Sequence, residues 1–192
     1  MCIRDSHNTD LEELWPTSRP LIREGDMALI SAPMDYLGIN YYFRSCIKSD
    51  GGHGYLEAPQ AGVERTQMGW EIHPEGLRDL LTRFQARYPA LPPIYITENG
   101  MASNDQVVDG RVVDEQRIRY FARHFAAIDA AMRAGVRVKG YFAWSLLDNF
   151  EWAYGYAKRF GLIHVDYATQ RRTMKDSALA LRAFLARRNA HS

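Results

Sequence analysis

Short strand-like segments alternate along this chain with longer segments of helical periodicity, and this alternation limits the fold more than any other feature. The expected strands, rich in β-branched and aromatic residues, are 35–43, 94–97 and 138–147. The expected helices are 75–88, 118–132 and a last one from about Asp176. Strands that alternate with helices predict a parallel sheet covered by helices. We therefore expect an α/β fold.

The helices are predicted from apolar residues spaced three and four apart. The first stripe is Leu77, Leu80, Leu81, Phe84 and Tyr88, and the second is Ile118, Phe121, Phe125, Ile128 and Met132, with Gly135 placed to end it. Residues 10–32 suggest short helices broken at Pro16 and Pro20, while residues 48–66, rich in glycine and polar groups, suggest a surface loop. No composition break divides the chain, so residues 1–192 are expected to form a single domain.

Composition narrows the classes of partner. The formal charge of +1, from 24 basic and 23 acidic residues, gives no reason to expect nucleic acid or an anionic membrane. No apolar run approaches the roughly 18 residues of a membrane span, and Met1–Ser6 lacks the apolar core of a signal peptide. We therefore expect a cytoplasmic protein. Two distant cysteines, Cys2 and Cys46, and six scattered histidines predict no disulfide framework and no metal site.

Polar and aromatic side chains gather where each expected strand ends. They are Asn40, Tyr41 and Tyr42 after the first strand, Glu98 and Asn99 after the second, and Trp144, Asp148, Asn149, Glu151 and Trp152 after the third. The carboxyl ends of parallel strands meet at one edge of a sheet, where α/β proteins bind ligands. Carboxylates and amides bind hydroxyl groups, and indoles stack on sugar rings. The pattern favours a carbohydrate ligand, although aromatic residues alternatively serve only as core.

Several of these segments resemble glycoside hydrolase family 1. Residues 96–100, Ile-Thr-Glu-Asn-Gly, resemble the nucleophile signature of its β-glucosidases, and residues 37–42 resemble its sixth barrel strand. Residues 68–72 resemble the segment before its sixth helix, residues 140–152 its eighth strand and loop, and residues 159–162, 165–167 and 175–177 its closing segment. The likeness is collinear from about residue 10 to the end. It implies a partial TIM (β/α)₈ barrel, strands six to eight with their helices.

The resemblance also implies residue roles for a retaining β-glucosidase. Glu98 would be the nucleophile, and Tyr42 would donate a hydrogen bond that orients it. The implied substrate-binding residues are Asn40, Trp70, Trp144, Glu151, Trp152 and Phe160. The substrate would be a β-glucoside or cello-oligosaccharide with a terminal non-reducing β-D-glucosyl residue, although galactosides and fucosides stay open. The phospho-sugar branch of the family carries Ser and Lys in the loop of Glu151, so an unphosphorylated sugar is expected.

Packing explanations stay open beside these roles. Tyr42 alternatively belongs to the core, Trp70 packs on a helix, and Phe160 is more readily a packing residue than a ligand contact. Asp148 and Asn149 alternatively only turn their loop. His124 lies within a helical segment and receives no role, and the pair Arg171 and Arg172 is expected on a solvated face.

Retaining glycosidases use two carboxylates about 5–5.5 Å apart together with water, so the resemblance implies no cofactor. The resemblance places the second one, the acid/base, in a Thr-x-Asn-Glu-Pro motif at the fourth barrel strand, and no Asn-Glu-Pro occurs in these 192 residues. A complete barrel takes about 250 residues or more. We therefore expect a fragment that is inactive alone, prone to aggregate through two unpaired sheet edges, and dependent on the N-terminal half of the barrel. Residues 1–6 match nothing in the family and are expected to be non-native. The alternative is a non-catalytic sugar-binding or interaction half-barrel.

Overall fold

The computed structural model describes residues 23–52 and 54–189, which fall into two compact units that meet between Asp35 and Tyr36. The described part of the first unit, residues 23–35, contains the short helix α2 (Asp26–Ile30), in agreement with the short helices expected over 10–32. The breaks expected at Pro16 and Pro20 and the expected non-native start at 1–6 lie outside the described residues. Whether residues 1–192 act as one domain stays a prediction.

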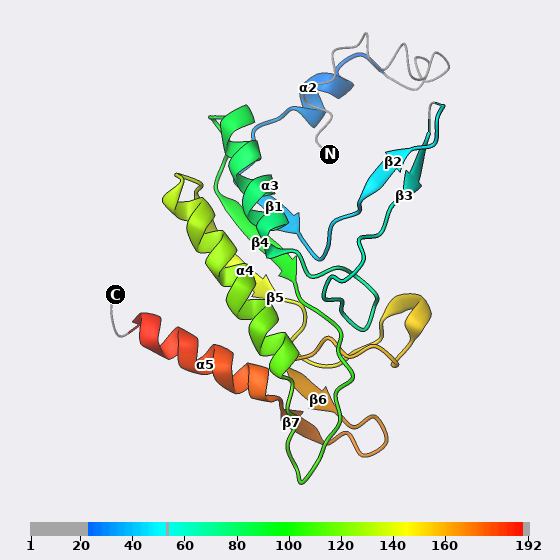
Figure 1. Ribbon diagram of the computed structural model, residues 1–192. Helices are drawn as coiled ribbons and strands as arrows, with labels where there is room; N and C mark the ends of the chain where they lie inside the picture. The colour runs from blue at the N-terminus through cyan, green and yellow to red at the C-terminus, as the bar shows by residue number, and fades with distance from the viewer. Residues whose placement is uncertain (1–22, 53, 190–192) are drawn as a thin grey trace. The chain divides into compact units, whose positions relative to one another are not determined.

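The second unit is built on a three-stranded parallel sheet. Its strands are β1 (Leu37–Asn40), β4 (Ile94–Asn99) and β5 (Val138–Ala143), in the order β1-β4-β5. Helix α3 (Pro74–Arg87) connects β1 to β4, and α4 (Glu115–Arg133) connects β4 to β5. Both helices cover the same face of the sheet (Figure 1). The predicted alternation is confirmed, and within the described residues β1 and β5 each have a partner on one side only.

Two hairpins and a final helix complete the unit. The hairpins are β2 (Ile47–Ser49) with β3 (Tyr55–Glu57), and β6 (Ile163–Val165) with β7 (Arg172–Met174). A 3₁₀ turn, η3, spans Trp152–Tyr154, and α5 spans Asp176–Asn189. The surface loop predicted over 48–66 is exposed as expected, but the prediction missed the hairpin within it. Both strands are only three residues long and every residue in them is exposed, so they are too short to carry a recognisable strand pattern.

The strands differ in length from those predicted. The first was expected over 35–43 and the third over 138–147, but β1 ends at Asn40 and β5 ends at Ala143. The second was expected to end at Thr97, yet β4 continues through Glu98 and Asn99. The aromatic residues beyond β1 and β5 have strand propensity. The amides of Tyr41 and Trp144 still donate to carbonyls of β4, but the chain beyond these two residues runs in loops.

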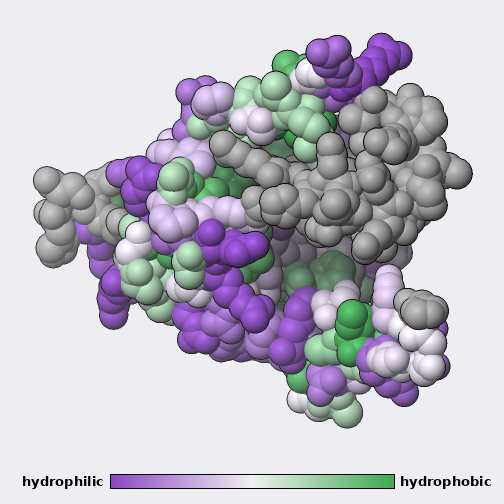
Figure 2. Space-filling model, turned by 90° about the horizontal axis from the view of Figure 1, so that it is seen from above, coloured by the Kyte–Doolittle hydropathy of each residue, from purple (hydrophilic) through white to green (hydrophobic). Residues whose placement is uncertain are grey.

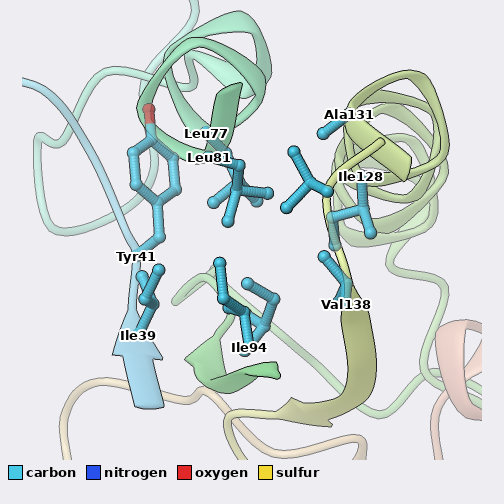
Figure 3. Close-up of a cluster of buried hydrophobic side chains, with 10 residues drawn as sticks. Ile39, Tyr41, Leu77, Leu81, Ile94, Ile128, Ala131 and Val138 are labelled. Atoms are coloured by element: carbon cyan, nitrogen blue, oxygen red, sulfur yellow. The ribbon is translucent and has the colours of Figure 1, made fainter. Parts of the chain in front are cut away.

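A hydrophobic core fills the space between the sheet and the two helices. Ile39, Ile94 and Val138 from the strands point toward Leu77 and Leu81 of α3 and toward Ile128 and Ala131 of α4 (Figure 3). Leu77, Leu81 and Ile96 are completely buried. The stripe predicted for residues 75–88 is confirmed, because its apolar spacing places these side chains on one helical face.

Helix α4 buries most of the predicted apolar stripe, since Phe121 and Ile128 are buried and Phe125 packs against the core. The stripe was wrong at Met132, which is 42% exposed, and it left out Arg117, Tyr120 and His124, which are buried. The prediction counted only apolar residues, and this face includes polar side chains whose hydrogen bonds are made inside the protein. The ring of His124 lies 3.9 Å from that of Tyr120, and its Nδ1 lies 2.8 Å from the Tyr120 carbonyl oxygen.

Buried ion pairs fasten the loops after β4 and β5 to α4 and α5. Arg117 of α4 binds Asp105, with 2.7 Å between Nη2 and Oδ2. Lys175, just before α5, binds both Asp105 at 2.6 Å and Asp148 at 2.8 Å. Burial by itself would raise the pKa of Asp105, but the cations of Arg117 and Lys175 hold it below its usual value. Asp148, expected at most to turn its loop, is therefore a buried anchor for that loop.

Large apolar side chains stay exposed from β5 to the loop that follows it. They include Phe142 at 58%, Leu146 at 66%, Phe150 at 58% and Trp152 at 82% exposure. Hydrophobic residues lie uncovered among hydrophilic ones on the face seen from above in Figure 2. Several large exposed apolar side chains within one stretch of the chain indicate a surface that binds a ligand or another part of a protein.

The burial of His124 generates a pH prediction. Desolvation lowers its pKa to about 4, whereas the unfolded chain takes up this proton near pH 6.5. Between these values the unfolded state binds more protons, so the free energy of unfolding falls as the pH falls, by about 3 kcal/mol in all. Denaturant unfolding measured between about pH 7 and about pH 4 should show a smaller decrease for His124→Gln. Equal decreases for the two proteins would contradict this expectation.

Candidate active site

The candidate site lies at the carboxyl end of β4, where the strand register is irregular. Along β1, Ile39 pairs with Ile96 but the next residue, Asn40, pairs with Glu98. On the β5 side the register also shifts between Ile96 and Asn99. Ile96 and Asn99 are both 0% exposed on the face that the helices cover. The extra residue of this bulge leaves Thr97 and Glu98 together for the opposite face.

Glu98 is held there by Tyr42. The Tyr42 hydroxyl donates to Glu98 Oε2 across 2.6 Å, a length typical of a hydrogen bond to an ionised carboxylate. Burial, and next the hydrogen bond to Glu98, raise the pKa of Tyr42 far above its ordinary value. Tyr42 therefore keeps its proton at neutral pH and acts as a donor. The structure brings together the two residues to which the sequence gave the nucleophile and orienting roles.

Asn40 and two aromatic rings surround this pair. Asn40 Oδ1 accepts a hydrogen bond of 2.6 Å from Thr97 Oγ1, which fixes the amide beside Glu98 at the end of β1. The ring of Tyr42 lies edge-on to Trp70 at 5.4 Å and to Phe160 at 6.2 Å. Phe160 is only 3% exposed, which supports the packing explanation for this residue.

Trp144 and Glu151 come from the loop after β5. The Trp144 indole donates to Glu151, and the charge of Glu98 acts on Glu151. Burial first, and then the charge of Glu98, raise the pKa of Glu151 above its usual value. Two carboxylates thus share one region of low exposure. Trp152 is different: it opens η3 and is 82% exposed, so its ring is presented to solvent.

A cavity of about 300 Å³ lies beside Trp70, between the base of the β2–β3 hairpin and residues 65–71. Trp70 and Phe43, whose rings stack at 4.9 Å, form part of its wall together with the ion pair of Arg44 and Glu71. Glu98 does not line this cavity. Trp70 therefore borders both the ring cluster around Tyr42 and a separate hollow.

Sequence reasoning missed the residues behind β4. Tyr120 of α4 and Tyr141 of β5 both form hydrogen bonds with the Asn99 side chain, at 2.8 Å and 2.7 Å. Tyr120 lies three residues after Arg117 and four before His124, a helical spacing that would have marked a polar buried face if polar residues had been counted. Within the described residues, no group of three His, Cys, Asp or Glu side chains could hold a metal ion, and no helix is long and apolar enough to span a membrane.

Comparison with known proteins identifies the family. The pattern of glycosyl hydrolase family 1 matches residues 4–190. The chain is 41% identical over 186 residues to the bifunctional beta-D-glucosidase/beta-D-fucosidase of Bifidobacterium breve, covering 87% of this chain and 40% of that protein. It is 40% identical over 180 residues to the 6-phospho-beta-galactosidase of Streptococcus equi subsp. zooepidemicus, covering 82% and 38%. The chain belongs to glycosyl hydrolase family 1.

A solved structure agrees with this assignment. The psychrophilic beta-glucosidase BglU from Micrococcus antarcticus superposes with a TM-score of 0.87 at 41% identity, covering 96% of this chain and 45% of that one. The resemblance found in the sequence is confirmed. The chain spans about two fifths of the length of the curated relatives. The assignment of β1, β4 and β5 as barrel strands six to eight stays a prediction.

Gly100, directly after β4, generates a test of the close packing behind the site. A Cβ atom at Gly100 would lie 1.8 Å from the Trp144 carbonyl oxygen, so Gly100→Ala must displace the backbone of Gly100 or of Trp144. We expect this substitution to lower the free energy of unfolding by about 2 kcal/mol or more. Gly52→Ala is the matched control, because its Cβ would meet only Asp50 Oδ1 at an ordinary 3.5 Å. Equal denaturation midpoints for both variants would contradict the expectation.

Proposed function

We propose that this chain supplies the nucleophile part of a retaining β-glucosidase barrel. The observation that carries the proposal is the 2.6 Å hydrogen bond from Tyr42 to Glu98 at the end of β4. A tyrosine that keeps its proton fixes one carboxylate oxygen and leaves the other to attack. A carboxylate that only capped or turned a strand end would have no use for such an orienting partner.

The chemistry follows the two-step retaining scheme. Glu98 attacks the anomeric carbon, the glycosidic bond breaks, and a glycosyl ester forms on the carboxylate. The departing oxygen takes its proton from a second carboxylic acid, which then removes a proton from the water that hydrolyses the ester. Tyr42 holds Glu98 aimed in both steps. Asn40, beside Glu98, is placed to bind a hydroxyl of the sugar next to the reacting carbon.

The proposed substrate is an unphosphorylated β-glucoside or cello-oligosaccharide. Glu151 is half-buried near Glu98, where a second negative charge would repel a sugar phosphate and suits a free hydroxyl. Trp144 and the exposed Trp152 offer indole faces to the sugar, and Trp70 borders the side of the leaving group. Because one relative is a 6-phospho-beta-galactosidase, 6-phosphogalactosides belong in the assay, and we expect them to react more slowly than glucosides.

The second candidate function is a non-catalytic sugar-binding or interaction half-barrel. The exposed apolar residues from Phe142 to Trp152 favour a surface that contacts something else. A binding module, however, has no need of a nucleophile with an orienting tyrosine. The two functions differ in one respect that can be measured, which is turnover by Glu98.

The proposal is tested by measuring glucoside hydrolysis in a completed barrel. The part of the Bifidobacterium breve relative that precedes the matched segment is joined to this chain, and hydrolysis of an aryl β-glucoside and of cellobiose is measured. We expect turnover that Glu98→Gln lowers by a factor of about 10⁴ or more, while binding of the intact substrate persists. Glu115→Gln, an exposed carboxylate at the start of α4, is the matched control and should keep full activity. Turnover that survives Glu98→Gln would overturn the proposal.

The chain without the added part should hydrolyse cellobiose negligibly. The second carboxylate is proposed to come from the preceding part of the barrel, and loss of general acid catalysis slows departure of an ordinary alcohol by about 10²–10⁴. An aryl glucoside whose phenol leaves without a proton should suffer less from this loss. Measurable turnover of cellobiose by the 192-residue chain would contradict the proposal that the second carboxylate comes from the preceding part of the barrel.

A further inference from the structure

We propose that the Asn99 side chain, held by Tyr120 and Tyr141, is a positioning clamp that sets the hydrogen bond between Tyr42 and Glu98. The clamp consists of the Asn99 amide, the Tyr41 carbonyl and the hydroxyls of Tyr120 and Tyr141. Its catalytic consequence rests on the proposed function, but its effect on Tyr42 does not.

The contacts of Asn99 join three elements and the end of β1. Asn99 Nδ2 donates to the Tyr41 carbonyl at 2.7 Å and to the Tyr120 hydroxyl at 2.8 Å. Asn99 Oδ1 accepts from the Tyr141 hydroxyl at 2.7 Å. Both amide protons and the amide oxygen are therefore in use. Asn99 is 0% and Tyr120 1% exposed, so water cannot replace either partner.

The clamp lies one residue away from both Tyr42 and Glu98. Tyr41 precedes Tyr42, and Asn99 follows Glu98. The Tyr41 amide also donates to the Glu98 carbonyl at 2.9 Å, so both backbone polar groups of Tyr41 bind residues 98 and 99. Beyond Asn40 the strand ladder has ended. The Asn99 side chain thus replaces the missing backbone bond and fixes the direction in which Tyr42 leaves β1.

The far side of the clamp is rigid. The Tyr120 oxygen also receives a hydrogen bond from the Gly100 amide, and its ring packs against His124. On the strand side, the Trp144 amide donates to the Asn99 carbonyl at 2.9 Å. A shift of Asn99 would therefore move Glu98 and Tyr42 relative to each other, because no partner of the clamp can follow without breaking another buried bond.

A nuclear magnetic resonance measurement on the full 192-residue chain tests the clamp without any turnover. The Tyr42 hydroxyl proton in a short bond to a carboxylate resonates far downfield, and its loss in Tyr42→Phe assigns it. We expect Tyr120→Phe and Tyr141→Phe, which delete one clamp hydroxyl each, to move this signal upfield or abolish it. Tyr167→Phe is the matched control: it deletes a hydroxyl that donates to the Asn149 carbonyl at 3.4 Å, outside the clamp, and should leave the signal in place.

Kinetics in the completed barrel give a second measurement, which a merely structural role would not reproduce. Tyr120→Phe should lower kcat about tenfold with little change in KM, since a small misplacement of the nucleophile slows only the chemical step. In the Tyr42→Phe background the same substitution should have less than about a twofold effect, because the two residues act through one hydrogen bond. A structural role would instead give the same factor in both backgrounds.

The outcomes separate the clamp from the proposed function. An unchanged Tyr42 signal in both clamp variants, or an equal change in Tyr167→Phe, overturns the clamp. Equal kinetic factors in the two backgrounds overturn it as well. A completed barrel without turnover overturns the glucosidase proposal, and the Tyr42 signal then still decides whether the clamp positions this residue.

Discussion

The bulge at the end of β4 is the constraint on which the site depends. Regular alternation would place Ile96 and Glu98 on one face of the sheet and Thr97 and Asn99 on the other. The shifted register instead buries Asn99 beside Ile96 and turns Glu98 to the open face. One irregularity thus presents a carboxylate to a ligand and buries an amide among the helices. Burying Glu98 in this core would have required an ionised carboxylate to lose its hydration.

Two kinds of interaction, apolar packing and buried ion pairs, stabilise the protein around the β4 bulge. Apolar side chains of β1, β4, β5, α3 and α4 form the core under the sheet. Buried ion pairs hold the loops on which Trp144 and Glu151 lie, because Asp148 binds both Lys175 and Arg159. Removing one member of such a pair leaves an uncompensated buried charge, which costs far more than loss of an exposed pair. The loop after β5 is therefore fixed although it has little regular structure.

The charges of the site also indicate which kind of ligand it suits. Glu98 and Glu151 both carry carboxylates in a region where Tyr42 and Trp144 donate to them. Each donor stabilises its own partner, while burial first, and then the charge of Glu98, raise the pKa of Glu151. Such an arrangement suits a neutral, hydroxylated ligand better than an anionic one. The exposed apolar residues beyond β5 add a surface that this part of the chain does not cover by itself.

The sequence by itself determined the α/β class, the helices α3, α4 and α5 and the family, and it named Tyr42 and Glu98, which the structure brings together. These follow from periodicity and from short motifs, which are local properties of the chain. Only the tertiary structure decided the ends of the strands, the polar residues that α4 buries beside its apolar stripe, and the partners of Asn99 and Asp148. Tyr120 and Lys175 lie 21 and 27 residues from these partners, and the hairpin strands are too short to carry a recognisable strand pattern. Such features depend on which groups find hydrogen-bond or ionic partners once segments distant in sequence have packed together, and no local pattern records that.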